Sequence, residues 1–132
     1  MSSQQLAVGL GCDRGTSYTT VAQALVQALN KIGATAADIN CFASIDVKAD
    51  EQGLLTLANT LGKPIVFYRA EELAEVAVPN PSETVRKYVG TPAVSEAACL
   101  LAAKRTQEFL IVEKHKYCGS DGKNATVSIA RI

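Results

Sequence analysis

The sequence predicts an α/β domain, a three-layer sandwich with a mostly parallel sheet and an antiparallel C-terminal strand. Short apolar runs alternate with longer segments of helical periodicity along the 132 residues. This alternation is typical of a parallel sheet with helices on both faces. A turn signal at 120–122 precedes the last apolar run and predicts a hairpin partner. Because no linker, internal repeat or low-complexity tract interrupts the chain, we expect one domain over 1–132.

Five apolar runs are expected to form the strands. The first is followed by a glycine-rich turn, and the second leads into a polar segment at 46–51. Their short length and apolar character are typical of strands that are buried within a sheet. The expected strands are 6–10, 41–47, 65–68, 109–112 and a closing strand that contains Val127, Ile129 and Ile132.

Helical spacing fills the intervals between these runs. In the first interval, the apolar residues that recur on one helix face are Val21, Leu25, Ala28, Leu29 and Ile32. Gly33 then provides a C-terminal cap. A second helix is expected from Asp50 to Leu61, and a short third helix over 70–76. The prolines in 78–90 indicate a loop that restarts helix at Ser82.

The last helix is expected to begin at Thr91, because the next residue is Pro92, and proline is favoured at the first position of a helix. Its apolar stripe is rich in alanine, which predicts close packing against the sheet. The stripe consists of Val94, Ala97, Ala98 and Leu101.

Composition excludes several classes of function. The chain has 13 basic and 13 acidic residues, so no net charge attracts nucleic acid or an anionic membrane. Its longest uncharged stretches are too polar to span a bilayer, and the N-terminus lacks the basic region of a signal peptide. The four cysteines form no Cys-x-x-Cys pair, which favours a reducing compartment without disulfides. We therefore expect a cytoplasmic protein.

Polar clusters follow the apolar runs where helices are expected to begin. A helix N-terminus has unpaired N–H groups and about half a positive charge, so it suits carboxylates and phosphates. If a parallel sheet brings several such ends to one edge, they form a site for a polyanionic small molecule. The clusters lie at 11–17, 46–51, 78–83 and 90–92.

The candidate ligand-binding residues belong to these clusters. They are Gly11, Cys12, Arg14, Gly15, Thr16, Asp46, Lys48, Asn80, Ser82, Gly90 and Thr91. A guanidinium within a glycine-rich turn can pair with a carboxylate or phosphate, although a solvated arginine fits the same pattern. Asp50 and Glu51 are interpreted as helix cap and dipole partner. Asp46 as a proton carrier and Lys48 as an anion ligand are left open.

Other ligand classes fit less well. The glycines at Gly9, Gly11 and Gly15 are spaced one residue wider than the dinucleotide fingerprint, so a nucleotide site ranks third. His115 is the only histidine, and the scattered cysteines do not add a convergent ligand set. We therefore expect neither a metal site nor a cofactor. His115 is interpreted as a surface residue of a basic hairpin over 114–124.

Six phrases stand in order over nearly the whole chain. They are Gly11-Cys12-Asp13-Arg14-Gly15, Asp46-Val47-Lys48-Ala49-Asp50-Glu51, Phe67-Tyr68-Arg69-Ala70-Glu71-Glu72-Leu73, Val78-Pro79-Asn80-Pro81-Ser82-Glu83, Val89-Gly90-Thr91-Pro92-Ala93-Val94-Ser95-Glu96-Ala97-Ala98 and Lys123-Asn124-Ala125-Thr126-Val127-Ser128-Ile129-Ala130-Arg131. Together they resemble the CbiG C-terminal domain/CobE family of cobalamin (vitamin B12) biosynthesis. One departure is Asp13, where the family often has arginine.

The resemblance implies a stand-alone protein that binds a corrin-ring intermediate, of precorrin or hydrogenobyrinate type, as a carrier or auxiliary factor. Other enzymes of cobalamin biosynthesis are then the expected partners. The carboxylate rim of such a ring suits helix N-termini and cations. The resemblance also implies an alternative, a cobalt-precorrin-5A-type lactone hydrolase that releases acetaldehyde. For that reaction Asp46 or Glu96 is the candidate base.

Overall fold

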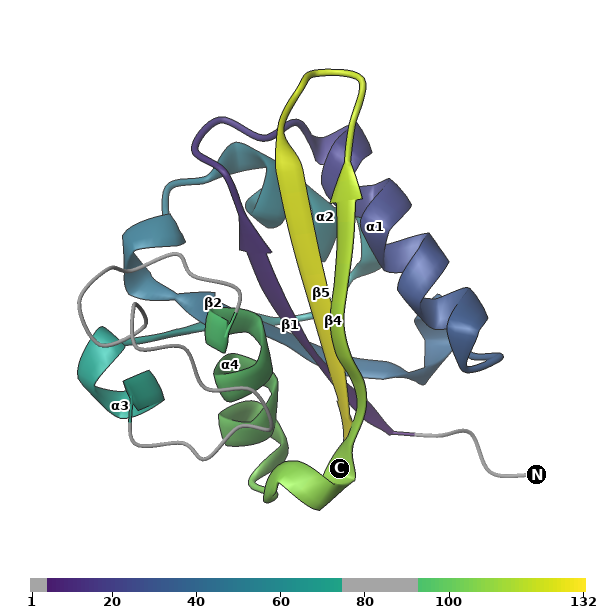
Figure 1. Ribbon diagram of the computed structural model, residues 1–132, viewed down its shortest axis with the longest axis vertical. Helices are drawn as coiled ribbons and strands as arrows, with labels where there is room; N and C mark the ends of the chain where they lie inside the picture. Colours follow the sequence, from purple (N-terminus) through teal and green to yellow (C-terminus); the bar gives the residue numbers. More distant parts are fainter. Residues whose placement is uncertain (1–4, 75–92) are drawn as a thin grey trace.

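The computed structural model describes residues 5–74 and 93–132, which form an open five-stranded sheet in the order β3-β2-β1-β5-β4 (Figure 1). The strands are β1 (Leu6–Cys12), β2 (Ile39–Ile45), β3 (Ile65–Tyr68), β4 (Leu110–Cys118) and β5 (Asn124–Arg131). β1 pairs in parallel with β2, and β2 with β3, whereas β5 pairs antiparallel with both β1 and β4. Only β5 therefore opposes the other strands, which confirms the predicted sheet.

Helices cover both faces of this sheet and make three layers. α1 (Tyr18–Lys31) and α2 (Gln52–Leu61) pack on one face, and α3 (Ala70–Ala74) and α4 (Ala93–Ala103) on the other. Figure 1 shows α4 in front of the sheet and α2 behind it. None of the described helices is both long and apolar enough to cross a membrane.

The two faces of the sheet differ in the size of their side chains. The face under α1 and α2 contains large residues, among them Leu6, Leu10 and Phe42. The face under α4 contains small ones, and a Cβ added at Gly9 would lie 1.9 Å from the carbonyl oxygen of Ser95. The backbone of α4 thus lies directly on β1, which confirms the predicted close packing.

Several element boundaries differ from those predicted. β2 begins and ends two residues before the predicted 41–47. It ends at Ile45 because Asp46–Lys48 form a 3-10 helix, η2. β4 extends six residues beyond the predicted 109–112. Its polar second half, starting at Glu113, hid this extension in the sequence. α2 begins at Gln52 with Glu51 as its N-cap, so the interpretation of Asp50 as the cap was wrong by one residue.

Candidate functional site

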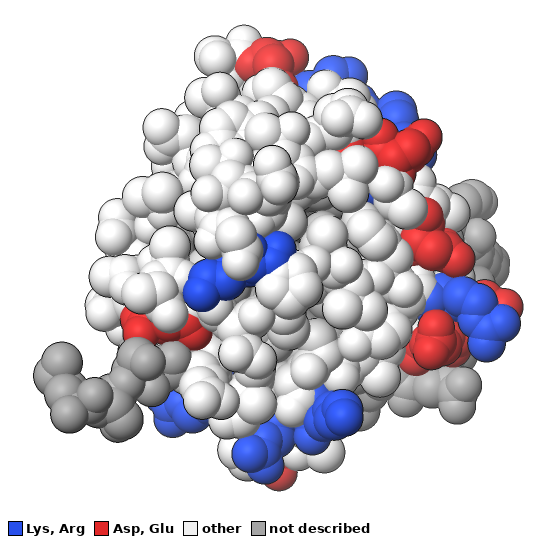
Figure 2. Space-filling view, turned by 180° about the vertical axis from the view of Figure 1, so that it is seen from behind, with Lys and Arg blue, Asp and Glu red and all other residues white. Residues whose placement is uncertain are grey.

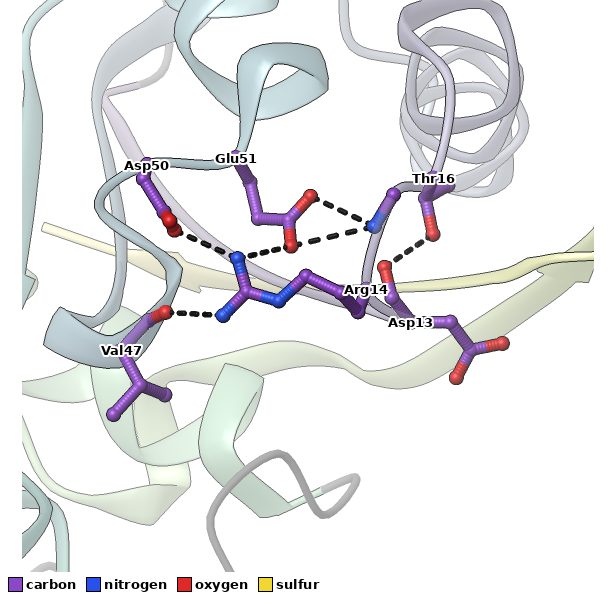
Figure 3. A network of polar contacts seen from close by, with 7 residues as sticks. Asp13, Arg14, Thr16, Val47, Asp50 and Glu51 are labelled. Atoms are coloured by element: carbon purple, nitrogen blue, oxygen red, sulfur yellow. Dashed lines mark hydrogen bonds and ion pairs between the residues drawn. The ribbon is translucent and has the colours of Figure 1, made fainter.

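The turns that follow β1 and β2 lie side by side and are joined by Arg14 (Figure 3). Its guanidinium nitrogen Nη1 lies 2.7 Å from Asp50 Oδ1 and 2.7 Å from Glu51 Oε2. Nη2 donates a hydrogen bond to the carbonyl oxygen of Val47 at 2.8 Å. These contacts raise the pKa of Arg14 through its hydrogen bond to Asp50, and lower the pKa of the Asp50 carboxyl. The predicted anion ligand Arg14 is thus already paired with carboxylates of its own chain.

Glu51, in the turn after β2, makes a second contact with the turn after β1. Its carboxylate is buried, and Oε1 accepts a hydrogen bond from the backbone N–H of Gly15 at 3.0 Å. The predicted site residue Thr16 donates its hydroxyl to the Asp13 carbonyl at 2.6 Å. At Gly53, in the first turn of α2, an added Cβ would lie 2.6 Å from the carbonyl oxygen of Thr16. The absence of a side chain at Gly53 therefore lets the turn after β1 lie against the start of α2.

A depression of about 500 Å³ opens between the N-terminal ends of α1 and α2. It lies at the carboxyl ends of parallel strands, where open α/β sheets bind ligands. Its lining combines backbone and polar side chains from both turns. The lining residues are Arg14, Gly15, Thr16, Ser17, Tyr18, Asp50, Glu51, Gln52, Gly53 and Thr56.

Lys48 lies at the same edge, beside Cys12 at the end of β1. Lys48 is 8% exposed, and its ammonium makes no hydrogen bond with any residue in the described parts of the chain. Burial raises the pKa of the Cys12 thiol, while the positive charge of Lys48 opposes that shift. Gly11 pairs with Thr126 of β5, and a Cβ there would meet only the Thr126 side chain at 3.9 Å. The structure therefore brings Gly11, Cys12 and Lys48 together with the two turns.

The two candidate bases lie in different surroundings. Asp46 is exposed on η2, and no hydrogen bond or ion pair joins its carboxylate to another described residue. Glu96, in the first turn of α4, is fully buried, and neither carboxylate oxygen accepts a hydrogen bond from the described chain. Burial is the main cause that raises the pKa of Glu96. Neither Asp46 nor Glu96 lines the depression.

Lys114, which lies at a β-bulge of β4, is the one cation near Glu96 within residues 5–74 and 93–132. The register with β5 shifts between Val112 and His115. Bulges of this kind re-aim side chains, and here Lys114 Nζ lies 3.8 Å from Glu96 Oε1. Beside this pair the hydroxyls of Ser95 and Ser128 lie 2.7 Å apart, and Ser128 also donates to the Glu113 carbonyl. The cluster connects α4 with both strands of the hairpin.

The hairpin between β4 and β5 is hydrogen-bonded to the turn after β1 and the start of α1. The sequence did not reveal this contact. Asp121 accepts hydrogen bonds from the backbone N–H of Ser17 at 3.0 Å and the hydroxyl of Thr20 at 2.9 Å. These bonds and that from the N–H of Lys123 lower the pKa of Asp121 to about 2. Asp13, the departure from the family pattern, accepts from both the backbone and the side chain of Asn124.

His115 differs from its interpretation as a surface residue. It is half-buried against α1, with Nε2 2.7 Å from Gln27 Oε1. Burial lowers the pKa of His115, and Lys31 adds to that shift. Four predicted ligand residues lie outside the described residues, so they have no structural account: Asn80, Ser82, Gly90 and Thr91.

The fold and these turns define a class of protein, an α/β domain whose polar depression lies at the carboxyl edge of its parallel strands. The chain belongs to the family described as "Cobalamin synthesis G C-terminus", whose model matches residues 6–130. It is thus a cobalamin biosynthesis protein of the CbiG/CobE type.

Curated relatives of two lengths match the chain. It is 33% identical to a cobalt-precorrin-5A hydrolase of Priestia megaterium over 127 residues, which are 96% of this chain and 32% of that protein. It is 38% identical to Protein CobE of a Sinorhizobium species over 111 residues, which are 83% of this chain and 71% of that protein. The chain thus spans about a third of the hydrolase and most of CobE.

Solved structures have the same fold. The crystal structure of CobE, a protein from the cobalamin biosynthetic pathway, matches with a TM-score of 0.77 at 30% identity, over 98% of this chain and 91% of that one. The cobalamin biosynthesis protein chiG from Agrobacterium tumefaciens matches with a TM-score of 0.67 at 28% identity, over 95% of this chain and 96% of that one.

Proposed function

We propose that the chain binds a corrin-ring intermediate, of precorrin or hydrogenobyrinate type, as a carrier or auxiliary factor. Its site is the edge formed by the turns after β1 and β2. The proposal rests chiefly on Lys48, a lysine that is 8% exposed and has no hydrogen-bond acceptor within the described residues. Because its ammonium has no acceptor of its own among the described residues at this edge, a carboxylate of the ring rim is a suitable partner for it.

The surroundings of Lys48 favour a ligand with several carboxylates. The N-terminal ends of α1 and α2 both face the depression of about 500 Å³, and helix N-termini favour anions. Gly11 leaves space beside the strand end, which suits the flat edge of a macrocycle. Arg14, held by Asp50 and Glu51, contributes by fixing the two turns rather than as a free cation.

The carboxylates at the depression support binding rather than hydrolysis. A general base works best with a pKa near the operating pH, whereas pairing with Arg14 lowers the pKa of the Asp50 carboxyl, and Glu51 is held by Arg14 and the N–H of Gly15. The hydrolase-named relatives are about three times longer than the matched segment. The rest of those chains is available to supply catalytic groups, which is why the activity is not carried over to this chain alone.

Titration with hydrogenobyrinic acid, followed by absorbance, tests the binding proposal. We expect saturable binding, which Lys48→Met weakens by about 1–3 kcal/mol because a charge-assisted contact is lost while the buried stem remains. Lys116→Met, an exposed lysine on β4, is the matched control and should bind normally. No binding at tens of micromolar, or equal affinity of the two variants, would contradict the proposal.

A lactone hydrolase is the second candidate, because Glu96 is a buried carboxyl with a raised pKa and no hydrogen-bond donor in the described chain. Carboxyl groups with this property are common at catalytic sites. Incubation of the chain with the lactone-bearing intermediate, with an assay for acetaldehyde, separates the two functions. Release that is lost in Glu96→Gln or Asp46→Asn would establish the hydrolase and replace the carrier role.

A further inference from the structure

The two carboxylates that contact Arg14 differ in how firmly they are held. Arg14 Nη1 lies 2.7 Å from both Asp50 Oδ1 and Glu51 Oε2, but the Asp50 side chain is 79% exposed and that of Glu51 is only 4% exposed. Glu51 also accepts a hydrogen bond from the N–H of Gly15. Exposed ion pairs are weak and screened by salt, so Asp50 can leave Arg14 far more easily than Glu51 can.

Arg14 and Asp50 lie where the proposed ligand binds. Both line the depression of about 500 Å³ between the starts of α1 and α2. Figure 3 shows one nitrogen of the guanidinium between the carboxylates of Asp50 and Glu51, and the other at the carbonyl of Val47. One positive charge thus faces two negative ones, and a ligand carboxylate that approaches Arg14 is repelled as long as Asp50 stays in place.

Charges elsewhere on the molecule do not favour anions over cations. The chain has 13 basic and 13 acidic residues, and Figure 2 shows groups of both signs along the margin of the side on which α2 lies. Selection of an anionic ligand therefore depends on single cations at the site, such as Arg14 and Lys48.

We infer that Asp50 is an internal competitor for the ligand, an inference that rests on the proposed function of the site. In the free chain its carboxylate occupies Arg14. When the corrin-ring ligand binds, one of the ligand's carboxylates takes the place of Asp50, while Glu51 and the Val47 carbonyl keep the guanidinium in position. The two turns stay joined throughout, so the exchange requires only that the exposed Asp50 side chain turn away.

This exchange makes the site selective for ligands with several carboxylates. Because Asp50 is part of the chain, it competes at a fixed effective concentration, on the order of millimolar or above. A dissolved monocarboxylate must exceed that concentration to displace it. A polycarboxylate that is already bound at Lys48 presents its second carboxylate from within the site, so it displaces Asp50 at a much lower concentration. Asp50 is thus a specificity-determining residue.

Titration with hydrogenobyrinic acid measures the competition. Asp50→Asn keeps the size of the side chain and removes its charge, so we expect it to bind the ligand about two- to sixfold more tightly, as the weakness of an exposed ion pair implies. Glu71→Gln removes one negative charge from an exposed position on α3 and is the matched control, which should bind like the wild type. If the wild type binds and Asp50→Asn binds no more tightly, the inference is overturned.

Arg14→Gln separates competition for the guanidinium from general repulsion by Asp50. It removes the group for which Asp50 and the ligand compete, so adding Asp50→Asn to it should leave the affinity unchanged. The same gain in affinity with and without Arg14 would show that Asp50 acts only by repulsion, and would overturn the inference. Both side chains are exposed, and circular dichroism checks that each variant is folded.

Citrate, a small polycarboxylate, tests the exchange without a corrinoid. In nuclear magnetic resonance spectra of the labelled chain, millimolar citrate should shift the Nε–H resonance of Arg14 in Asp50→Asn and leave it in place in the wild type. Equal responses of the two chains, including no response in either, would overturn the inference. If citrate distinguishes the two chains but neither binds hydrogenobyrinic acid, the proposed function fails while the role of Asp50 as competitor stands.

Discussion

The guanidinium of Arg14 and the carboxylate of Glu51 lie 2.7 Å apart, although 60% of the Arg14 side chain is exposed and only 4% of Glu51 is. An exposed cation thus balances a buried anion. The pair holds the turn after β1 against the beginning of α2, and the depression between the two helices takes its shape from that contact.

Glu51→Ala is expected to lower the free energy of unfolding by about 1–3 kcal/mol, because the N–H of Gly15 loses its acceptor in a partly buried position. Urea denaturation measures the change. Glu72→Ala is the control, since its carboxylate is 45% exposed, where water can replace both its ion pair with Arg69 at 3.7 Å and its hydrogen bond from the Arg69 N–H at 2.9 Å. An exposed pair of this kind contributes under about 1 kcal/mol. Equal losses in the two variants would contradict a structural role for Glu51.

Glu96 is expected to make the chain less stable as pH rises. Burial raises its folded-state pKa above 4.5, the usual value, which applies to the unfolded chain. At pH values between the unfolded and the folded pKa, the folded state binds more protons than the unfolded state. Stability therefore falls with rising pH through this window, by about 1.4 kcal/mol for each pKa unit of the shift. The charged and titratable groups around Glu96 are Lys114, Glu113 and Cys99.

Glu96→Gln removes this titration, and urea denaturation at several pH values detects it. Relative to the wild type, the variant should gain stability as pH rises above 4.5. Glu108→Gln, at an exposed position, is the control and should keep the wild-type slope in this window. A wild-type slope in Glu96→Gln as well would show that another group is responsible.

Gly9→Ala is expected to be strongly destabilising, because the added Cβ would lie 1.9 Å from the Ser95 carbonyl oxygen and push α4 off the sheet. Overpacking of this kind costs about 1–3 kcal/mol or more. Gly11→Ala is a close control on the same strand, with its nearest neighbour at 3.9 Å. Thermal unfolding should separate the two variants clearly. A folded Gly11→Ala with weakened corrinoid binding would in addition place the ligand against this strand end.

Asp121 is expected to stabilise the chain above pH 4 and to lose that effect in acid. Its folded pKa is about 2, against a usual value of 3.8, so the unfolded state takes up protons first as pH falls. The contribution is complete above 3.8 and disappears as pH drops toward about 2. Asp121→Ala should lower the melting temperature at pH 7 and speed hydrogen exchange at the N–H groups of Ser17 and Lys123. Unchanged exchange at both amides would rule out the tie between the hairpin and α1.

The sheet and its helices could be predicted from sequence because both signals are local. The stripe from Val21 to Ile32 and the alanine-rich stripe of α4 each lie within one element, and both faces are buried as expected. The turns at the strand ends were also predictable, since a parallel sheet must place them at one edge. Gly11, Cys12, Arg14 and Lys48 do meet there.

Long-range pairings could not be predicted in this way. Asp121 looks like an ordinary turn residue, and nothing near it in the sequence reveals a partner 104 residues away at Ser17. Glu96 lies near Lys114 of β4, 18 residues away, at a point where the register of β4 with β5 shifts. Arg14 was recognised as a cation, but its neutralisation by Asp50 and Glu51 depends on how closely two turns approach.

The position of β5 has a consequence for folding during synthesis. β5 is the last strand in the chain, yet it lies between β1 and β4 near the middle of the sheet. Until it emerges from the ribosome, β1 has one open edge with unpaired backbone groups, which invites pairing with other chains. The parallel strands therefore keep an unpaired edge at β1 until the final hairpin is made. Removing β5 from the C-terminal end would leave this aggregation-prone edge exposed rather than produce a smaller domain.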